Sequence, residues 1–276
     1  MNFKEINKRI NKAYSSLKEI SALKPKTAII LGSGLSDLSI ICNNGIEIPY
    51  RNIKEFPVST VDGHKGTLNI SNDIVIFSGR FHYYEGYHPK ETIMPILLAK
   101  KIGVRNLIIT NSSGAINGQF RVEDLILINN HINFMGVNPL IGENDDNLGS
   151  RFQELNSIYS NSNLMELTRS VYRKIFKEDI KEGTYLAVSG PCYETTAETH
   201  FFKTIGADLV GMSTVPEIII AAYLKMNTVA ISNVTNLASG MQNGSLSHEE
   251  VKINSAKISS KFEKLLRGII NKLESD

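Results

Sequence analysis

Six short apolar runs, each followed directly by small or polar residues, constrain the fold of this chain more than any other feature. The runs are rich in Val and Ile: Thr27–Leu31, Ile74–Phe77, Leu107–Thr110, Tyr185–Val188, Asp208–Val210 and Thr228–Ile231. Runs of this length and composition are typical of strands buried on both faces of a sheet. The longest continuous apolar run, Ile218–Leu224, is far shorter than the roughly 18 residues that a membrane span requires.

Patterns typical of helices lie before, between and after these runs. They cover residues 3–20, 89–102, 194–205, Glu217–Met226 and a long C-terminal stretch from a Ser-x-x-Glu capping box at Ser247 to about Leu273. Strands that alternate with helices predict an α/β fold with a largely parallel, mixed central sheet flanked by helices. Because no linker or repeat interrupts the pattern, we expect a single domain over residues 1–276. The polar stretch Asn138–Ser150 predicts a surface loop.

Composition excludes several classes of protein. The formal net charge is +2, from 30 basic and 28 acidic residues, which gives no basic footprint for nucleic acid. Two cysteines, Cys42 and Cys192, do not make a disulfide framework. The N-terminal residues lack the apolar stretch of a signal peptide. We therefore expect a cytoplasmic protein that does not associate with membranes.

The ends of the six predicted strands carry the polar residues of a predicted binding site. In open α/β sheets, ligands bind beyond the carboxyl ends of the strands. The segments in question are Gly32-Ser33-Gly34, Gly79-Arg80 with His82 and Tyr84, Asn111–Gly114, Gly190–Glu194, Gly211–Thr214, and Asn233 with Thr235 and Asn236. Six such clusters at one edge favour a single site.

The residue types suggest an anion beside a ring of polar groups. Backbone N–H groups and the hydroxyl of Gly32-Ser33-Gly34 can surround an oxyanion, and Arg80 offers a planar fork suited to phosphate. Hydroxyls at Ser112 and Ser213 and the imidazoles of His64 and His82 are further donors. Taken alone, each has an ordinary structural interpretation: a turn, a surface ion pair or a packed histidine. Cys192 has no partner that would make it a nucleophile.

Other phosphate and metal motifs fail on spacing. A dinucleotide-binding fingerprint requires a sixth-position Gly or Ala, where this chain has Asp37. The chain has no Walker motif, no H-E-x-x-H and no C-x-x-C, so a zinc site has no support in the sequence.

Eight ordered motifs nevertheless resemble one family, the trimeric purine nucleoside phosphorylases. They are LGSGL (31–35), GHKG (63–66), SGRFHYYEGY (78–87), TNSSG (110–114), GPCYETTAE (190–198), GADLVGMSTVPE (206–217), TN (235–236) and SHEEV (247–251). The resemblance implies the nucleoside phosphorylase fold, with a partly barrel-like sheet, and a homotrimer. It also implies inorganic phosphate as a cosubstrate, with no metal and no organic cofactor.

The resemblance further implies a role for each matching residue. The residues that would hold phosphate are Ser33, His64, Arg80, His82, Ser112 and Ser213. Those that would line the nucleoside pocket are Tyr84, Tyr193, Glu194, Val210, Met212, Asn236 and His248, with Phe152 contributed by a neighbouring subunit. Asn236, Glu194 and His82 are the expected catalytic residues.

The implied reaction is phosphorolysis of purine ribonucleosides and 2′-deoxyribonucleosides, with a preference for inosine and guanosine, in purine salvage. The nearest alternative is phosphorolysis of 5′-methylthioadenosine, for which the position of His248 is expected to be apolar. A dinucleotide-dependent oxidoreductase would rest on Gly32-Ser33-Gly34 alone, and a non-catalytic nucleoside-binding protein is the third alternative.

The small polar residues of Leu237–Ser247 predict a mobile lid.

Overall fold

The structure is a computed structural model that describes residues 1–275 except 18, 19, 21, 62, 161 and 242–247. The side chains of residues 248–253 and 255–257 are also outside the description. The predicted lid over Leu237–Ser247 therefore falls mostly outside the described residues, and so does the side chain of His248.

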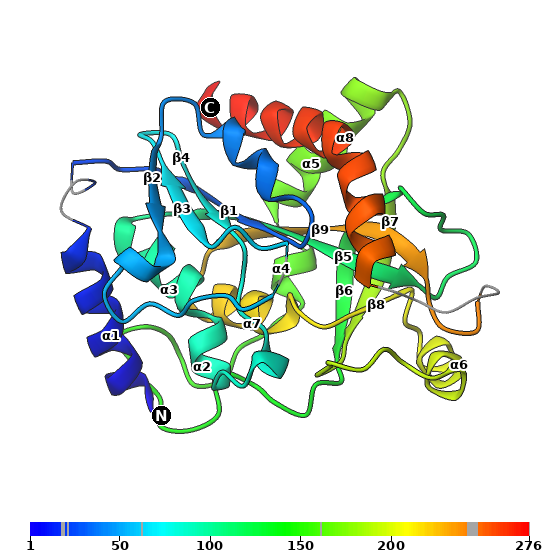
Figure 1. Cartoon of the computed structure of the whole chain (residues 1–276), viewed down its shortest axis with the longest axis horizontal. Helices are drawn as coiled ribbons and strands as arrows, with labels where there is room; N and C mark the ends of the chain where they lie inside the picture. The colour runs from blue at the N-terminus through cyan, green and yellow to red at the C-terminus, as the bar shows by residue number, and fades with distance from the viewer. Residues whose placement is uncertain (18–19, 21, 62, 161, 242–247, 276) are drawn as a thin grey trace.

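A nine-stranded sheet forms the centre of the molecule (Figure 1). Its strands are β1 (Thr27–Leu31), β2 (Ile46–Pro49), β3 (Thr67–Ile70), β4 (Ile74–Ser78), β5 (Asn106–Ala115), β6 (Leu125–Asn133), β7 (Lys181–Ala187), β8 (Leu209–Gly211) and β9 (Asn227–Leu237). The order across the sheet is β2-β3-β4-β1-β5-β8-β7-β6-β9, and β9 also pairs with β5. The strands β5, β8, β7, β6 and β9 therefore close into a ring, which confirms the partly barrel-like sheet.

Strand directions explain how six strand ends meet. The strands β4, β1, β5 and β9 run parallel, whereas β8 is antiparallel to β5 and β6 is antiparallel to β9. The pairing of β8 with β5 joins only Val210 and Leu209 to Gly114 and Ala115. Because only the last residues of β5 pair with β8, the carboxyl ends of these opposed strands lie side by side. The mixed sheet thus brings polar residues together without all strands being parallel.

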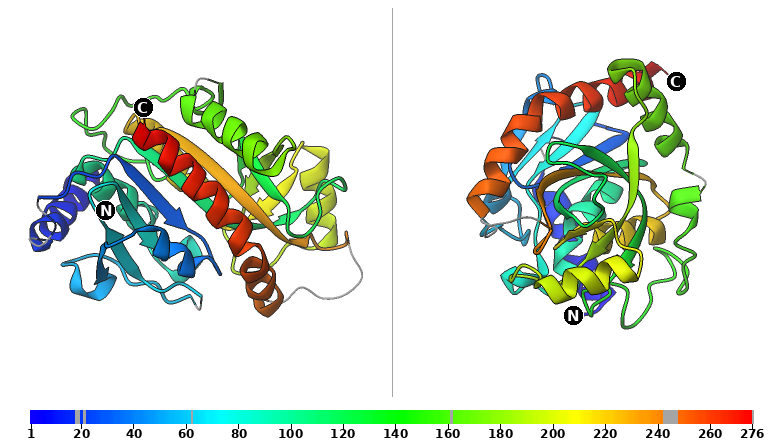
Figure 2. Two further views of the ribbon diagram at one scale, coloured as in Figure 1. Left: turned by 90° about the horizontal axis from the view of Figure 1, so that it is seen from above. Right: turned by 90° about the vertical axis from the view of Figure 1, so that its right-hand side faces the viewer.

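Helices cover both faces of the sheet. They are α1 (Phe3–Ser16), α2 (Pro89–Thr92), α3 (Met94–Ile102), α4 (Ser157–Ser160), α5 (Asn163–Phe176), α6 (Thr196–Thr204), α7 (Val215–Tyr223) and α8 (His248–Ser275). The helices α5 and α8 pack together on β9, and Figure 2 shows α8 lying along that strand. On the other face, α1, α3 and α7 bury a separate apolar cluster. No described helix is long and apolar enough to cross a membrane.

The structure corrects several predicted boundaries. The first helix ends at Ser16 rather than at residue 20. The helix expected over 89–102 is two helices that meet at Ile93, because Pro95 in the first turn of α3 has no N–H to continue the helical hydrogen bonds. The helix expected from 194 begins at Thr196, after a capping box on Thr195. The loop predicted over Asn138–Ser150 contains no helix or strand, as expected.

Candidate active site

A cleft lies where the ends of six strands meet. The predicted site residues that line it are Ser33, Arg80, His82, Tyr84, Ser112, Tyr193, Glu194, Val210, Met212, Ser213 and Asn236. The ring of strands, with β1 and β4 beside it, thus brings together residues as far apart in the sequence as Ser33 and Asn236.

Three predicted residues do not line this cleft. His64 lies just behind it, with Nε2 3.2 Å from the Ser33 hydroxyl and its ring 5.3 Å from that of His82. Phe152 is 89% exposed and contributes nothing to the cleft of its own chain. His248 begins α8, and its side chain is outside the described part of the chain.

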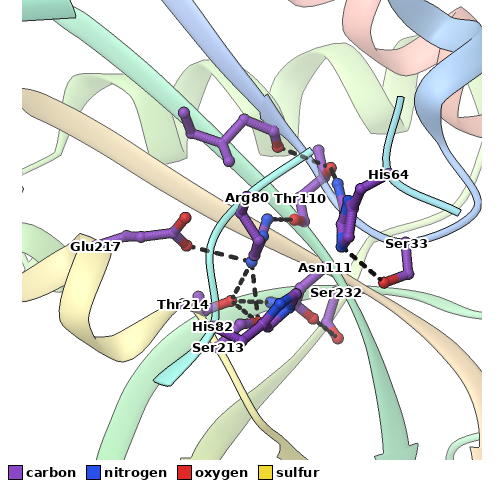
Figure 3. A network of polar contacts seen from close by, with 12 residues as sticks. Ser33, His64, Arg80, His82, Thr110, Asn111, Ser213, Thr214, Glu217 and Ser232 are labelled. Atoms are coloured by element: carbon purple, nitrogen blue, oxygen red, sulfur yellow. Dashed lines mark hydrogen bonds and ion pairs between the residues drawn. The ribbon is translucent and has the colours of Figure 1, made fainter. Parts of the chain in front are cut away.

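Arg80 is the buried cation at one end of the cleft. Its side chain is 2% exposed, and Nη1 donates hydrogen bonds to the hydroxyls of Ser213 (2.9 Å) and Thr214 (3.1 Å). Its Nη2 donates to the backbone oxygen of Thr110, and Nη1 lies 3.2 Å from Glu217 Oε2. Figure 3 shows these partners arranged around the guanidinium. The guanidinium plane is therefore fixed before any ligand binds.

Thr214 has a strained backbone next to this cation. Its φ of 71° and ψ of −49° belong to a γ-turn, in which the N–H of Val215 donates to the carbonyl of Ser213 at 2.7 Å. A positive φ is rare for a β-branched residue and costs on the order of 1–3 kcal/mol. The Thr214 hydroxyl accepts from Arg80 and from Asn111 Nδ2 (2.9 Å), and these bonds hold the turn. The turn at Thr214 places Ser213 beside Arg80.

His82 is oriented by the carboxylate of Glu85, to which the sequence motifs assigned no role. Its Nδ1 lies 2.9 Å from Glu85 Oε1, and the other Glu85 oxygen accepts from the N–H (2.8 Å) and hydroxyl (2.7 Å) of Thr60. Burial acts to raise the pKa of Glu85, but hydrogen bonds from His82 and Thr60 lower it to about 2. An ionised carboxylate accepts only, so Nδ1 of His82 carries a proton that it donates to Glu85. The spacing of three residues between His82 and Glu85 could have predicted this contact from the sequence.

Glu194 and Asn236 occupy the other end of the cleft. Glu194 is 9% exposed, and its Oε1 accepts from the backbone N–H of Ser239 at 2.9 Å. The Asn236 amide is oriented by the Thr235 hydroxyl, which donates to Oδ1 (2.9 Å), and by the Leu237 carbonyl, which accepts from Nδ2 (3.0 Å). A Cβ at Gly114 would lie only 3.0 Å from Nδ2, so a glycine there leaves room for the amide.

The cleft therefore has two chemically different ends. One end carries a guanidinium, imidazole rings and hydroxyls, which suit an anion rich in oxygen. The other end carries a carboxylate and an oriented primary amide, which suit a ligand edge that both donates and accepts hydrogen bonds. Tyr84, Val210 and Met212 supply apolar contact area around the cleft. The sequence motifs did not assign roles to Glu85, Thr214 or Glu217, which support the first end.

The chain is similar to known proteins over nearly its whole length. Residues 26–271 match the model of the phosphorylase superfamily. Purine nucleoside phosphorylase 1 of Bacillus subtilis is 42% identical over 273 residues, covering 96% of this chain and 99% of the relative. Crystal structures of Schistosoma mansoni purine nucleoside phosphorylase in complex with inosine and with adenosine each superpose with a TM-score of 0.87 at 31% identity. The inosine complex covers 96% of both chains, and the adenosine complex covers 99% of this chain and 98% of that one.

The chain therefore belongs to the phosphorylase superfamily and, within it, to the purine nucleoside phosphorylases. The fold of this enzyme is the one that the eight sequence motifs implied.

Proposed function

We propose that this cleft phosphorolyses 6-oxopurine ribonucleosides and 2′-deoxyribonucleosides, inosine and guanosine above all, to free base and (deoxy)ribose 1-phosphate. The observation that carries the proposal is the division of one cleft into an anion end at Arg80 and an amide–carboxylate end at Asn236 and Glu194. The Schistosoma mansoni relative is solved with both inosine and adenosine, which supports a purine nucleoside without choosing between the bases. A role in cytoplasmic purine salvage is part of the proposal.

At the anion end, inorganic phosphate would be held by Arg80, His82 and the hydroxyls of Ser33 and Ser213, with Ser112 and His64 close behind. As the bond from C1′ to the purine lengthens, positive charge develops on the sugar ring. The phosphate dianion stabilises this charge and then forms the new bond to C1′. The nucleophile is already an anion, so no metal or organic cofactor is required.

At the base end, the electron pair of the broken bond passes into the purine. The Asn236 amide would donate to N7, and Glu194 would accept from N1–H and, in guanine, from the 2-amino group. Preorganised donors and acceptors at the positions where charge develops are the usual source of catalytic stabilisation. The reaction balances because the released base takes up one proton and the hydrogen phosphate dianion loses one proton as it becomes the phosphate ester.

The direct test is release of hypoxanthine from inosine with and without inorganic phosphate. We expect no release without phosphate, and formation of ribose 1-phosphate in equal amount with the base when phosphate is present. Phosphate-independent release would identify a hydrolase, and binding of inosine without turnover would identify a binding protein.

We further propose that the active form is a homotrimer in which Phe152 completes the site of a neighbouring subunit. The 89% exposure of this aromatic side chain supports the proposal, because it leaves the ring accessible to a neighbouring subunit. The loop before it is fastened to the body of the molecule: the Lys90 ammonium donates to the Ile141 carbonyl, and the Tyr223 hydroxyl donates to the Asp145 carbonyl at 2.8 Å. Such anchoring would present Phe152 in a fixed position.

A Phe152→Ala variant is expected to raise KM for the nucleoside about tenfold, or ~1.4 kcal/mol, through lost aromatic contact. The informative measurement is complementation. When Phe152→Ala is coexpressed with inactive Asn236→Ala, mixed trimers contain sites with an intact Asn236 and a neighbour's intact Phe152. Activity should then exceed the sum of the two variants alone. Purely additive activity, or a fully active monomer in light scattering, would contradict the shared site.

A further inference from the structure

A buried ion pair lies directly behind the anion end of the cleft. The side chains of Arg80 and Glu217 are 2% and 5% exposed, and Arg80 Nη1 lies 3.2 Å from Glu217 Oε2. Glu217 belongs to the first turn of α7, which Thr214 precedes. The reaction derived above uses Arg80 but gives Glu217 no part.

Orientation of Arg80 does not account for this carboxylate. The hydroxyls of Ser213 and Thr214 and the carbonyl of Thr110 already accept hydrogen bonds from both terminal nitrogens of the guanidinium. A buried charge pair, moreover, often stabilises a fold no better than apolar residues of similar volume. What Glu217 supplies, and the neutral acceptors do not, is a negative charge.

Glu217 lies on the opposite side of Arg80 from Ser33 and His64, and Arg80 also lines the cleft (Figure 3). We propose that Glu217 is the resident counter-ion of Arg80, which keeps the empty site stable and weakens the binding of phosphate to the same cation. This inference rests on the proposed function, because it takes phosphate as the anion at Arg80.

The electrostatics support both parts of the proposal. Without Glu217, Arg80 would be a buried cation with no counter-charge, which destabilises a fold strongly. With phosphate bound, a dianion and a carboxylate would share one cation in a low-dielectric interior, where like charges repel far more than in water. Release of a phosphorylated product would be eased by the same repulsion.

The test is Glu217→Gln, which keeps the volume of the side chain and removes its charge. We expect isothermal titration with inorganic phosphate to give a Kd at least fivefold lower than that of the wild type. KM for phosphate should fall to the same extent, whereas KM for inosine should stay within twofold. The rise in Tm caused by saturating phosphate should at least double, because phosphate then provides the missing counter-charge.

Glu182→Gln is the matched control, because Glu182 pairs with Arg169 on the outer side of β7, at 2.7 Å and away from the cleft. It should leave the Kd for phosphate unchanged. A Glu217→Gln variant that folds only in phosphate would support the inference. Unchanged or weaker phosphate binding in a folded variant would overturn it, and so would failure to fold even in saturating phosphate. Absence of phosphate binding by the wild type would instead refute the proposed function.

Discussion

The kcat/KM for inosine should exceed that for adenosine by several orders of magnitude. The expected ratio approaches the roughly 10⁴–10⁵ by which a site rejects a substrate that leaves its buried polar groups unpaired. The reason lies in Glu194, which is 9% exposed and has one oxygen committed to the N–H of Ser239. An ionised carboxylate only accepts hydrogen bonds, so it suits the N1–H of a 6-oxopurine. Adenine presents a lone pair at N1, which would face the carboxylate charge.

Asn236 reinforces this selectivity through the leaving group. A 6-oxopurine spreads the departing electron pair onto O6, whereas adenine leaves poorly unless N7 is protonated. An amide near neutral pH donates a hydrogen bond but not a proton. Asn236→Asp offers a protonatable carboxyl, and it should shift the ratio of kcat/KM towards adenosine by at least tenfold.

Both nucleosides should be assayed at saturating phosphate, for the wild type and for Asn236→Asp. Asn227→Asp is the control, because it makes the same change at the opposite end of β9, where Asn227 contacts Asn106 rather than the cleft. A wild-type ratio near one would refute the pairing of Glu194 and Asn236 with the base. An equal shift in Asn227→Asp would show that the added charge acts non-specifically.

Arg80→Ala should lower kcat/KM for phosphate at least tenfold, or about 1.4 kcal/mol of transition-state stabilisation. Arg80 is the one arginine among the described residues that line the cleft, and its hydrogen bonds to Ser213 and Thr214 hold these two hydroxyls in place. The same change leaves Glu217 as a buried carboxylate without its cation, which we expect to cost roughly 3–5 kcal/mol of stability.

A second variant separates the two effects of losing Arg80. Arg80→Ala combined with Glu217→Gln contains neither buried charge, so its free energy of unfolding should recover much of the loss while phosphate use stays impaired. Steady-state kinetics with phosphate varied, together with urea denaturation, measure the two quantities. Unchanged phosphate dependence in either folded variant would show that Arg80 does not bind the cosubstrate.

The elements that sequence patterns predicted are those whose signal is local. The buried strand β1 has the predicted bounds, because its five residues are all apolar or small and all buried. The helix α5 was missed although Leu164, Thr168, Val171 and Tyr172 are buried at helical spacing, so the signal was present. The strand β6 changes from apolar Leu125–Ile128 to mostly polar Asn129–Asn133, and β2 is largely exposed, so neither has the pattern of a buried strand.

For the site, too, the sequence predicts the residues within each local motif but not the contacts between distant ones. The motifs contain every residue that lines the polar ends of the cleft, but not the contacts among them. The pairing of Arg80 with Glu217 and the bond from Asn111 to Thr214 join residues more than a hundred positions apart, and no spacing rule encodes them. The strained turn at Thr214 runs against its local preference, and its hydroxyl accepts hydrogen bonds from Arg80 and Asn111, which are both distant in the sequence.

The closed ring of strands also determines the point in synthesis at which the active site can first form. The strand β9 (Asn227–Leu237) completes the ring by pairing with both β5 and β6, and it carries Asn236. Until it leaves the ribosome, the inner edges of β5 and β6 are unpaired, and exposed edges of this kind invite association with other chains. Closure over so long a stretch of chain is slow as well as late. A nascent chain that stops before residue 227 therefore lacks Asn236 and leaves the edges of β5 and β6 that pair with β9 open.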